Sequence, residues 1–296
     1  MIDTRQGVSP SRENMVIFHE MGHGYSELMR FKFPVKRSGY EMSDNDRERL
    51  KMRMAQQRKD KEEYRQEQRA KGIEIIDKLP NNLTRTRKAI RVKAMCNPWE
   101  YMVTFTQSPK FDRNDLTAFK RRITGMIKRL NDIRRIKGNP LIRFLLVFEL
   151  HADMKAWHMH GFLSGLDDTE TRKFTENEKI PERVKEMLRS GREVRSWIEY
   201  EMEIGWNTLV KITDPKGAAL YATKYITKDA QRNASELGEH MYMCSRGLDE
   251  GKKKAGTLIK EPEQPASFRN DYVSIWRVEN PDEIQTLNQS IAWDRP

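Results

Sequence analysis

Two apolar runs separated by a short polar gap most constrain what this chain can fold into. The first, IRFLLVFEL, covers residues 142–150, and the second, AWHMHGFL, covers residues 156–163. Their β-branched and aromatic content predicts two buried strands. The short gap between them predicts an antiparallel hairpin.

The segments around this hairpin mix strands and helices without a regular βαβ alternation. Aromatic and β-branched content predicts further strands at residues 99–106, 206–213 and 272–278. Helical spacing and start signals predict helices beginning at Thr84 and over residues 112–137, 181–190, 195–203 and 214–231. The sequence therefore predicts an α+β fold with a central antiparallel sheet and flanking helices.

Composition divides the chain into three parts. Of the 296 residues, 37% are hydrophobic and 33% are charged, so we expect part of the chain to be exposed rather than core. Residues 1–80 are expected to form a charged helical or partly disordered N-terminal arm, because residues 42–72 are dense in Arg, Lys, Glu and Gln. Residues 81–250 hold the hairpin and its neighbours, and residues 251–296 form a C-terminal extension.

The charge balance points to a phosphate-bearing partner. The formal net charge is +11, which is typical of proteins that meet nucleic acid, although a merely soluble basic protein is the alternative. Cys96 and Cys244 form no disulfide or metal pattern, which favours a reducing compartment. No apolar run approaches the roughly 20 residues needed to span a bilayer, and the polar N-terminus has no signal core. These features predict a cytoplasmic protein with no membrane partner.

Alternation along the second apolar run places two histidines on one side of a strand. Because residues i and i+2 of a strand point to one face, His158 and His160 project together while Met159 points away. Glu149 and His151 share a parity, so either could reach across the hairpin as a third ligand. Two imidazoles and a carboxylate suit Mg²⁺, Mn²⁺ or Zn²⁺ and leave positions open for substrate oxygens. Two structural histidines on a half-exposed strand are the alternative.

The segment YATKYITK repeats one tetrad, Tyr221 with Lys224 and Tyr225 with Lys228. Four residues are about 400° of helical rotation, so the two tyrosines share a face about 6 Å apart along the axis. A tyrosine hydroxyl is a weak nucleophile alone, but a metal-polarised phosphate and a nearby ammonium favour its attack. A helix that packs two aromatics on a sheet and points its lysines to solvent is the alternative.

Taken in order, these motifs resemble those of the HUH endonucleases, in particular the rolling-circle replication initiators of bacteriophages and plasmids. VTFTQ at 103–107 is similar to the family's first motif. FELHADMKAWHMHGFLSGL at 148–166 is similar to the second, and YATKYITKD at 221–229 to the two-tyrosine version of the third. SRGL at 245–248 also resembles a segment of phage-type initiators. The resemblance spans the expected nuclease domain, from residue 84 to residue 250.

The resemblance implies a metal-dependent, site-specific endonuclease and strand transferase acting on single-stranded or hairpin origin DNA. A tyrosine attacks a phosphate polarised by Mg²⁺ or Mn²⁺, which leaves a 5′-phosphotyrosyl link and a free 3′-OH, and the second tyrosine can rejoin strands later. The assigned residues are Glu149, His158 and His160 for the metal, Tyr221 and Tyr225 as nucleophiles, Lys224 and Lys228 for the phosphate, and Thr104 and Thr106 for support of the sheet or the DNA.

Motif order separates the activities within this resemblance. The tyrosines follow the histidine pair, as in replication initiators, whereas conjugative relaxases have the reverse order. A transposase shares the chemistry, and a non-catalytic basic DNA-binding protein is a further alternative. No G-x-x-x-x-G-K-[ST] motif is present, so unwinding is expected to need a helicase and replication machinery of the bacterial host.

A competing motif, HEMGH, occupies residues 19–23. On a helix, His19 and His23 would share a face and could bind zinc as in HExxH proteases. That reading needs a third ligand and a cleft, yet no further histidine occurs before His151. We expect a short amphipathic helix here, with a zinc protease as the remote alternative.

Overall fold

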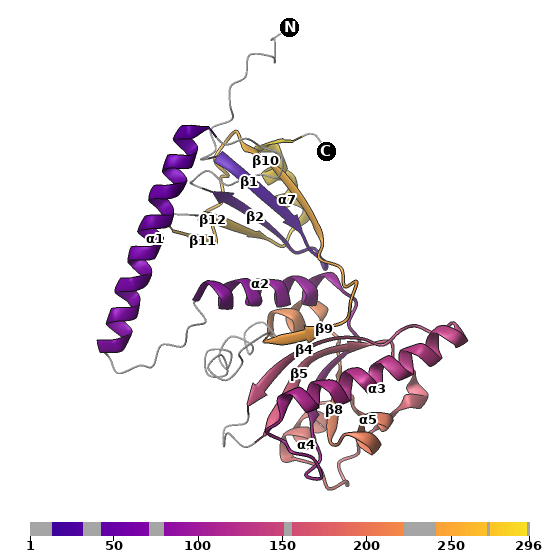
Figure 1. Ribbon diagram of the computed structural model, residues 1–296. Coiled ribbons are helices and arrows are strands. Elements are labelled where there is room, and N and C mark those ends of the chain that lie inside the picture. Colours follow the sequence, from indigo (N-terminus) through magenta and orange to yellow (C-terminus); the bar gives the residue numbers. More distant parts are fainter. Residues whose placement is uncertain are drawn as a thin grey trace. The chain divides into compact units, whose positions relative to one another are not determined.

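The computed structural model describes residues 14–31, 43–70, 80–150, 156–221, 241–270 and 273–294. The chain divides into two compact units (Figure 1). One unit joins Met1–Ile75 to Glu250–Pro296, and the other consists of Ile76–Asp249. Each unit contains an antiparallel sheet and helices, so the predicted α+β class with antiparallel strands is confirmed.

The sheet of the central unit, Ile76–Asp249, has seven described strands. Their spatial order is β6 (Thr171–Lys173), β7 (Val194–Trp197), β8 (Asn207–Lys211), β3 (Tyr101–Thr106), β5 (Trp157–Ser164), β4 (Arg143–Leu150) and β9 (Tyr242–Cys244). The two apolar runs form the predicted antiparallel hairpin, with Glu149 directly across from His158. β5 therefore lies inside the sheet, between β3 and β4.

Helix α3 (Leu116–Lys137) packs against one face of this sheet through its apolar stripe. The helix begins where Asp115 accepts a hydrogen bond from the Ala118 N–H at 2.8 Å and ends at Gly138, whose φ of 69° is left-handed. Phe119, Ile123 and other apolar residues of α3 meet the inward-facing residues of β3, β4 and β5 in one core. The burial of this face leaves the opposite face of the sheet for function.

The opposite face is covered at one end by the region around α2 (Pro80–Cys96). Ile90 and Met95 of α2 are fully buried, and Trp99 stacks on Phe162 of β5 with ring centroids 5.6 Å apart. The Trp99 indole N–H also donates to the Lys93 carbonyl at 3.3 Å, which ties the stacked ring to α2. The predicted helix beginning at Thr84 is thus present and begins earlier, at Pro80.

One predicted helix of the central unit is partly wrong. Residues 194–197 form β7, and only Ile198–Glu203 are helical, as α5. The strand is fixed by its neighbours, because Val194 and Arg195 pair with β8 and the Asn207 side chain hydrogen-bonds both backbone groups of Trp197. The nearby helix α4 (Glu182–Arg189) agrees with the prediction for residues 181–190.

The other unit combines both ends of the chain in a second antiparallel sheet. Its strand order is β11 (Phe268–Arg269), β12 (Val273–Val278), β2 (Ser26–Phe31), β1 (Met15–Glu20), β10 (Lys252–Leu258) and β13 (Ile291–Trp293). Helix α7 (Pro281–Gln289) contributes Leu287 to the core of this sheet, and α1 (Asp44–Ala70) is the predicted charged helix.

This pairing differs from the separate arm over residues 1–80 and extension over residues 251–296 expected from composition. β1 and β2 are strands because Val16, Phe18 and Leu28 bury against apolar residues of β10, β12 and α7. The composition of a short segment gives no information about strand partners that lie more than two hundred residues away in the sequence. No described helix is both long and apolar enough to cross a membrane.

The HEMGH segment is not a helix, which corrects the sequence-based prediction. His19 lies in β1 and is fully buried, with its Nε2 2.6 Å from the Glu250 carbonyl oxygen. His23 lies in the following turn, with a left-handed φ of 59°. The two histidines therefore do not share a helical face, and the geometry that an HExxH protease requires is absent.

Candidate metal and nucleotide site

The predicted histidine pair lies on the sheet face that α3 does not cover. This histidine face carries Thr104 and Thr106 of β3, His158 and His160 of β5, and Glu149 of β4, as the strand registers require. The two imidazole rings are nearly parallel, at 12°, with centroids 6.3 Å apart. The structure therefore brings the three predicted metal ligands to one place.

Each imidazole is oriented by a threonine directly across from it on β3. Nδ1 of His158 lies 2.9 Å from the Thr106 hydroxyl, and Nδ1 of His160 lies 3.1 Å from the Thr104 hydroxyl. A hydroxyl can donate or accept, so it accommodates either neutral tautomer of the ring. When the ring N–H is at Nδ1 and donates to threonine, Nε2 presents a lone pair to a metal.

Glu149 contacts the second histidine rather than the one directly across from it. Its Oε2 lies 2.7 Å from Nε2 of His160. Both side chains are part-exposed, so solvent or a substrate oxygen can reach this pair. Of the two candidates for the third ligand, Glu149 thus lies beside the histidines, whereas His151 lies outside the described residues.

The donor set fits a divalent metal ion. Two ligand atoms that lie about 2.1 Å from one octahedral ion at right angles are about 3 Å apart, close to the present contact between Glu149 and His160. The carboxylate suits Mg²⁺ or Mn²⁺ and the two imidazoles suit Zn²⁺, so the set can hold any of these three ions. Within the described residues, no three His, Cys, Asp or Glu side chains already converge as a complete ion-binding group. The side chains must therefore move to close the set around an ion.

The tyrosine helix follows β8. Residues 215–221 are helical, and Asp214 accepts a hydrogen bond from the Gly217 N–H at 2.9 Å at the start of this helix. Tyr221 is the last residue described before the gap at 222–240 and is 43% exposed, so its side chain is accessible. Lys224, Tyr225 and Lys228 lie outside the described residues.

A cavity of about 370 Å³ lies beside Thr106, at the end of the sheet where Thr106 pairs with His158. Thr106 lies between His158 on β5 and Trp206, which precedes β8, because the Thr106 N–H donates to the Trp206 carbonyl at 2.9 Å. The cavity is lined by Thr106, Gln107, Ser108, Pro109, Lys110, Arg113, Glu201, Gly205 and Trp206. It is therefore contiguous with the row of side chains that holds the histidines.

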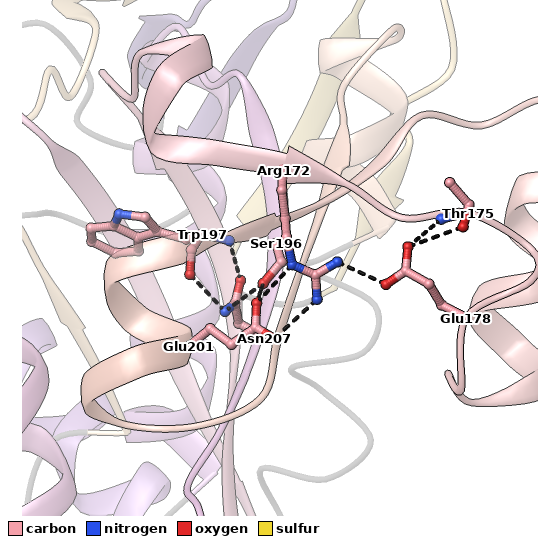
Figure 2. A network of polar contacts seen from close by, with 7 residues as sticks. All are labelled: Arg172, Thr175, Glu178, Ser196, Trp197, Glu201 and Asn207. Atoms are coloured by element: carbon pink, nitrogen blue, oxygen red, sulfur yellow. Dashed lines mark hydrogen bonds and ion pairs between the residues drawn. The ribbon is translucent and has the colours of Figure 1, made fainter.

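One wall of this cavity is fixed by a polar network, shown in Figure 2. Arg172 donates to both carboxylate oxygens of Glu201, at 3.0 and 3.2 Å, and to Glu178 at 2.8 Å. Ser196 donates to Glu201 at 2.6 Å, and Asn207 donates to Ser196 at 3.2 Å. The hydrogen bond from Arg172 is the main cause that lowers the pKa of Glu201, so this carboxylate is ionised and already neutralised within the wall.

Sequence reasoning missed two parts of this site. The sequence pattern gives Thr104 and Thr106 only a supporting role; their i, i+2 spacing repeats that of the histidine pair, but the contacts depend on the register of β3 against β5. The cavity gave no signal of its own, because its residues come from three separate segments.

No family model, no curated protein and no solved structure matches this chain significantly.

Proposed function

We propose that this protein is a metal-dependent endonuclease and strand transferase of the HUH type that initiates rolling-circle DNA replication. The observation that carries the proposal is that Glu149, His158 and His160 lie on one sheet face, with both imidazoles oriented by threonines. The order of the sequence motifs supports the assignment to replication initiators. The antiparallel central sheet agrees with the architecture that the resemblance implies.

In this proposal Glu149 and the Nε2 atoms of His158 and His160 hold Mg²⁺ or Mn²⁺. When bound, the ion polarises the scissile phosphate of single-stranded or hairpin origin DNA. The threonine hydroxyls hydrogen-bond Nδ1 of each imidazole and so orient the rings while Nε2 acts as the ligand. Removing a threonine hydroxyl should therefore weaken metal binding without removing any ligand.

Tyr221 or Tyr225 is the nucleophile of the proposed reaction. Its hydroxyl oxygen forms a bond to phosphorus while the bond from phosphorus to the 3′-oxygen breaks. The tyrosine proton is lost and a proton is taken up at the departing oxygen, so the products are a 5′-phosphotyrosyl link and a 3′-OH. Lys224 and Lys228 stabilise the charge that develops on the phosphate.

A second tyrosine can reverse the reaction on a new strand. After one round of synthesis, its attack on the regenerated origin frees the first strand, whose 3′-OH then displaces the first tyrosine. Strands are thus rejoined as circles. Because the sequence contains no phosphate-binding loop of a helicase, the proposed partners are origin DNA and the host helicase and replication machinery, in the cytoplasm of a bacterial cell.

The proposal can be tested by incubating the protein and Mn²⁺ with single-stranded DNA from the replicon that encodes the chain. We expect a protein–DNA adduct that survives SDS and is absent when the metal is chelated. The double variant Tyr221→Phe/Tyr225→Phe should form no adduct. The matched control is Tyr242→Phe, which changes a tyrosine on β9 instead and should leave the adduct unchanged.

The outcomes separate the proposal from its alternatives. An adduct in the double tyrosine variant rules out tyrosine attack by this helix. DNA binding with no adduct under any metal condition indicates a non-catalytic basic DNA-binding protein. A transposase or a relaxase forms the same adduct, and closure of the strand into a circle by the same protein distinguishes the replication initiator.

A further inference from the structure

The cavity beside Thr106 has no role in the nicking chemistry and contains the elements of a nucleotide site. Trp206 lies at one wall, with its ring 5.1 Å from that of Phe174 and tilted by 33°. An aromatic side chain that is part-exposed and held by a second ring offers a stacking surface for a nucleobase. A volume of about 370 Å³ is within the range of small-molecule sites.

Two cations at this cavity form no ion pair with a described residue. Lys110 is exposed and Arg113 is part-exposed, and neither forms an ion pair within the described residues. This differs from Arg172, Arg195 and Arg134, which are all paired with carboxylates. Unpaired cations beside an aromatic wall favour a ligand that carries both a phosphate and a base.

A buried amide donor at the cavity supports the same ligand. Gln107 is only 2% exposed, and its Oε1 accepts a hydrogen bond from Arg122 at 2.7 Å. Its Nε2 has no hydrogen-bond partner among the described residues. A buried polar atom without a partner is costly in an empty protein, so an acceptor on a bound ligand gives it a role.

The position of the cavity connects it to the histidines. Glu149, His158, Thr106 and Trp206 follow one another across four neighbouring strands or strand ends. With strands about 4.8 Å apart, Trp206 lies about 10 Å across the sheet from His158. A nucleotide next to a phosphate held at the histidines can reach that distance.

We propose that this cavity binds one nucleotide of single-stranded DNA adjoining the phosphate at the histidine cluster. The base stacks on Trp206 and accepts from Gln107, and the backbone phosphate lies at Lys110 and Arg113. The location of this nucleotide relative to the cleaved bond rests on the proposed nuclease function. The presence of a base-binding site does not depend on that function.

The test measures equilibrium binding of the full chain to fluorescent single-stranded DNA of mixed sequence, without divalent metal. A strand of the same length and backbone that carries no bases is the second probe. Wild type should bind the base-bearing strand about tenfold more tightly than the abasic strand, as one stacked base provides. Trp206→Leu should lose this preference while its affinity for the abasic strand is unchanged.

Four further variants keep the test decisive. Trp293→Leu removes another part-buried tryptophan that packs on a phenylalanine and should keep the base preference. Lys110→Gln should weaken binding of both probes equally, whereas Lys128→Gln, at an exposed position of α3, should have a smaller effect on either. If Trp206→Leu does not fold, Gln107→Glu replaces the buried N–H donor by a carboxylate oxygen and should lower affinity for the base-bearing strand about tenfold.

A base preference that survives in folded Trp206→Leu, or in Gln107→Glu, overturns the proposal. Failure of the nuclease proposal is a separate result. If the preference depends on Trp206 and no tyrosine adduct forms, the cavity binds a nucleotide but the chain is no nuclease. If the adduct forms and the preference does not depend on Trp206, the nuclease stands and the cavity is not its nucleotide site.

Discussion

The hydroxyl of Thr106 lies 2.9 Å from Nδ1 of His158, and the two residues face each other across adjacent strands. The contact orients the His158 ring through Nδ1, so that Nε2 can contact another group. Thr104 stands in the same relation to His160, so the orientation is built twice into one strand pair. Hydrogen bonds that orient a histidine through its second ring nitrogen are typical of the residues that surround metal ligands.

Replacing the hydroxyl by a methyl group tests that relationship. We expect Thr106→Val to weaken Mn²⁺ binding by about 10- to 100-fold, because the near-isosteric side chain can no longer hold Nδ1 of His158. The measurement is the free Mn²⁺ signal in electron paramagnetic resonance during a titration. Thr208→Val is the control, since Thr208 faces Thr104 from β8 on the same sheet face. Equal affinities in the two variants would argue that the threonine contact has no role in metal binding.

The variant Glu149→Gln tests whether Glu149 or His151 is the third metal ligand. The amide keeps the shape of the side chain and can still hydrogen-bond Nε2 of His160, but it is a much poorer ligand for Mg²⁺ or Mn²⁺. We expect the Mn²⁺ affinity and the tyrosine adduct both to be lost while thermal stability changes little. His151→Gln should retain both. The reverse pattern would assign the third position to His151.

How much of the site was predictable from sequence follows from the range of each interaction. The hairpin of β4 and β5 was predicted because two apolar runs are close in sequence, and parity alone placed His158 and His160 together. The threonine contacts were not predictable in the same way. They depend on the register of β3 against β5, between residues 52 to 56 positions apart.

For the HEMGH segment, a local sequence pattern predicts a helix that the structure does not contain. Its i, i+4 histidines fit a helix locally, and nothing nearby in sequence contradicts that reading. The strand is stabilised by a partner at the far end of the chain, since the residue that contacts the His19 ring is 231 positions away. A short local motif is therefore outweighed by tertiary pairing that no sequence window contains.

The network around Arg172 should make stability depend on pH. The hydrogen bond from Arg172 is the largest cause that lowers the pKa of Glu201 below its usual 4.5. A lowered carboxylate pKa means that the pair stabilises the fold above about pH 4.5 and loses this contribution as the pH falls through the folded-state pKa. Arg172 and Glu201 are each about one-third exposed, so solvent screening limits the effect.

We therefore expect Arg172→Gln to lower the free energy of unfolding by about 1 kcal/mol at neutral pH and by less at about pH 3. Urea denaturation at both values measures the difference. Arg135→Gln is the control, because Arg135 forms an exposed pair with Asp132 on α3. A loss that is the same at both pH values would show that the arginine acts through packing rather than through charge.

Gly205 is a position beside the cavity where a single methyl group should be disruptive. Its φ is +152°, and a Cβ there would lie 2.4 Å from the Ser108 nitrogen and 2.7 Å from the Thr106 oxygen. These backbone atoms belong to the loop that lines the cavity, so they cannot move without disturbing it. Gly205→Ala should lower the free energy of unfolding by at least about 2 kcal/mol.

The matched control for that change is Gly125→Ala in the middle of α3. No atom lies within 4 Å of a Cβ built there, and the residue is helical and exposed. Alanine should therefore stabilise the helix by about 0.5–1 kcal/mol, because it restricts the unfolded chain. Thermal and urea unfolding of the two variants should move in opposite directions. If Gly205→Ala is as stable as wild type, the backbone of Thr106 and Ser108 does not pack closely against Gly205, and these residues do not form the cavity wall together.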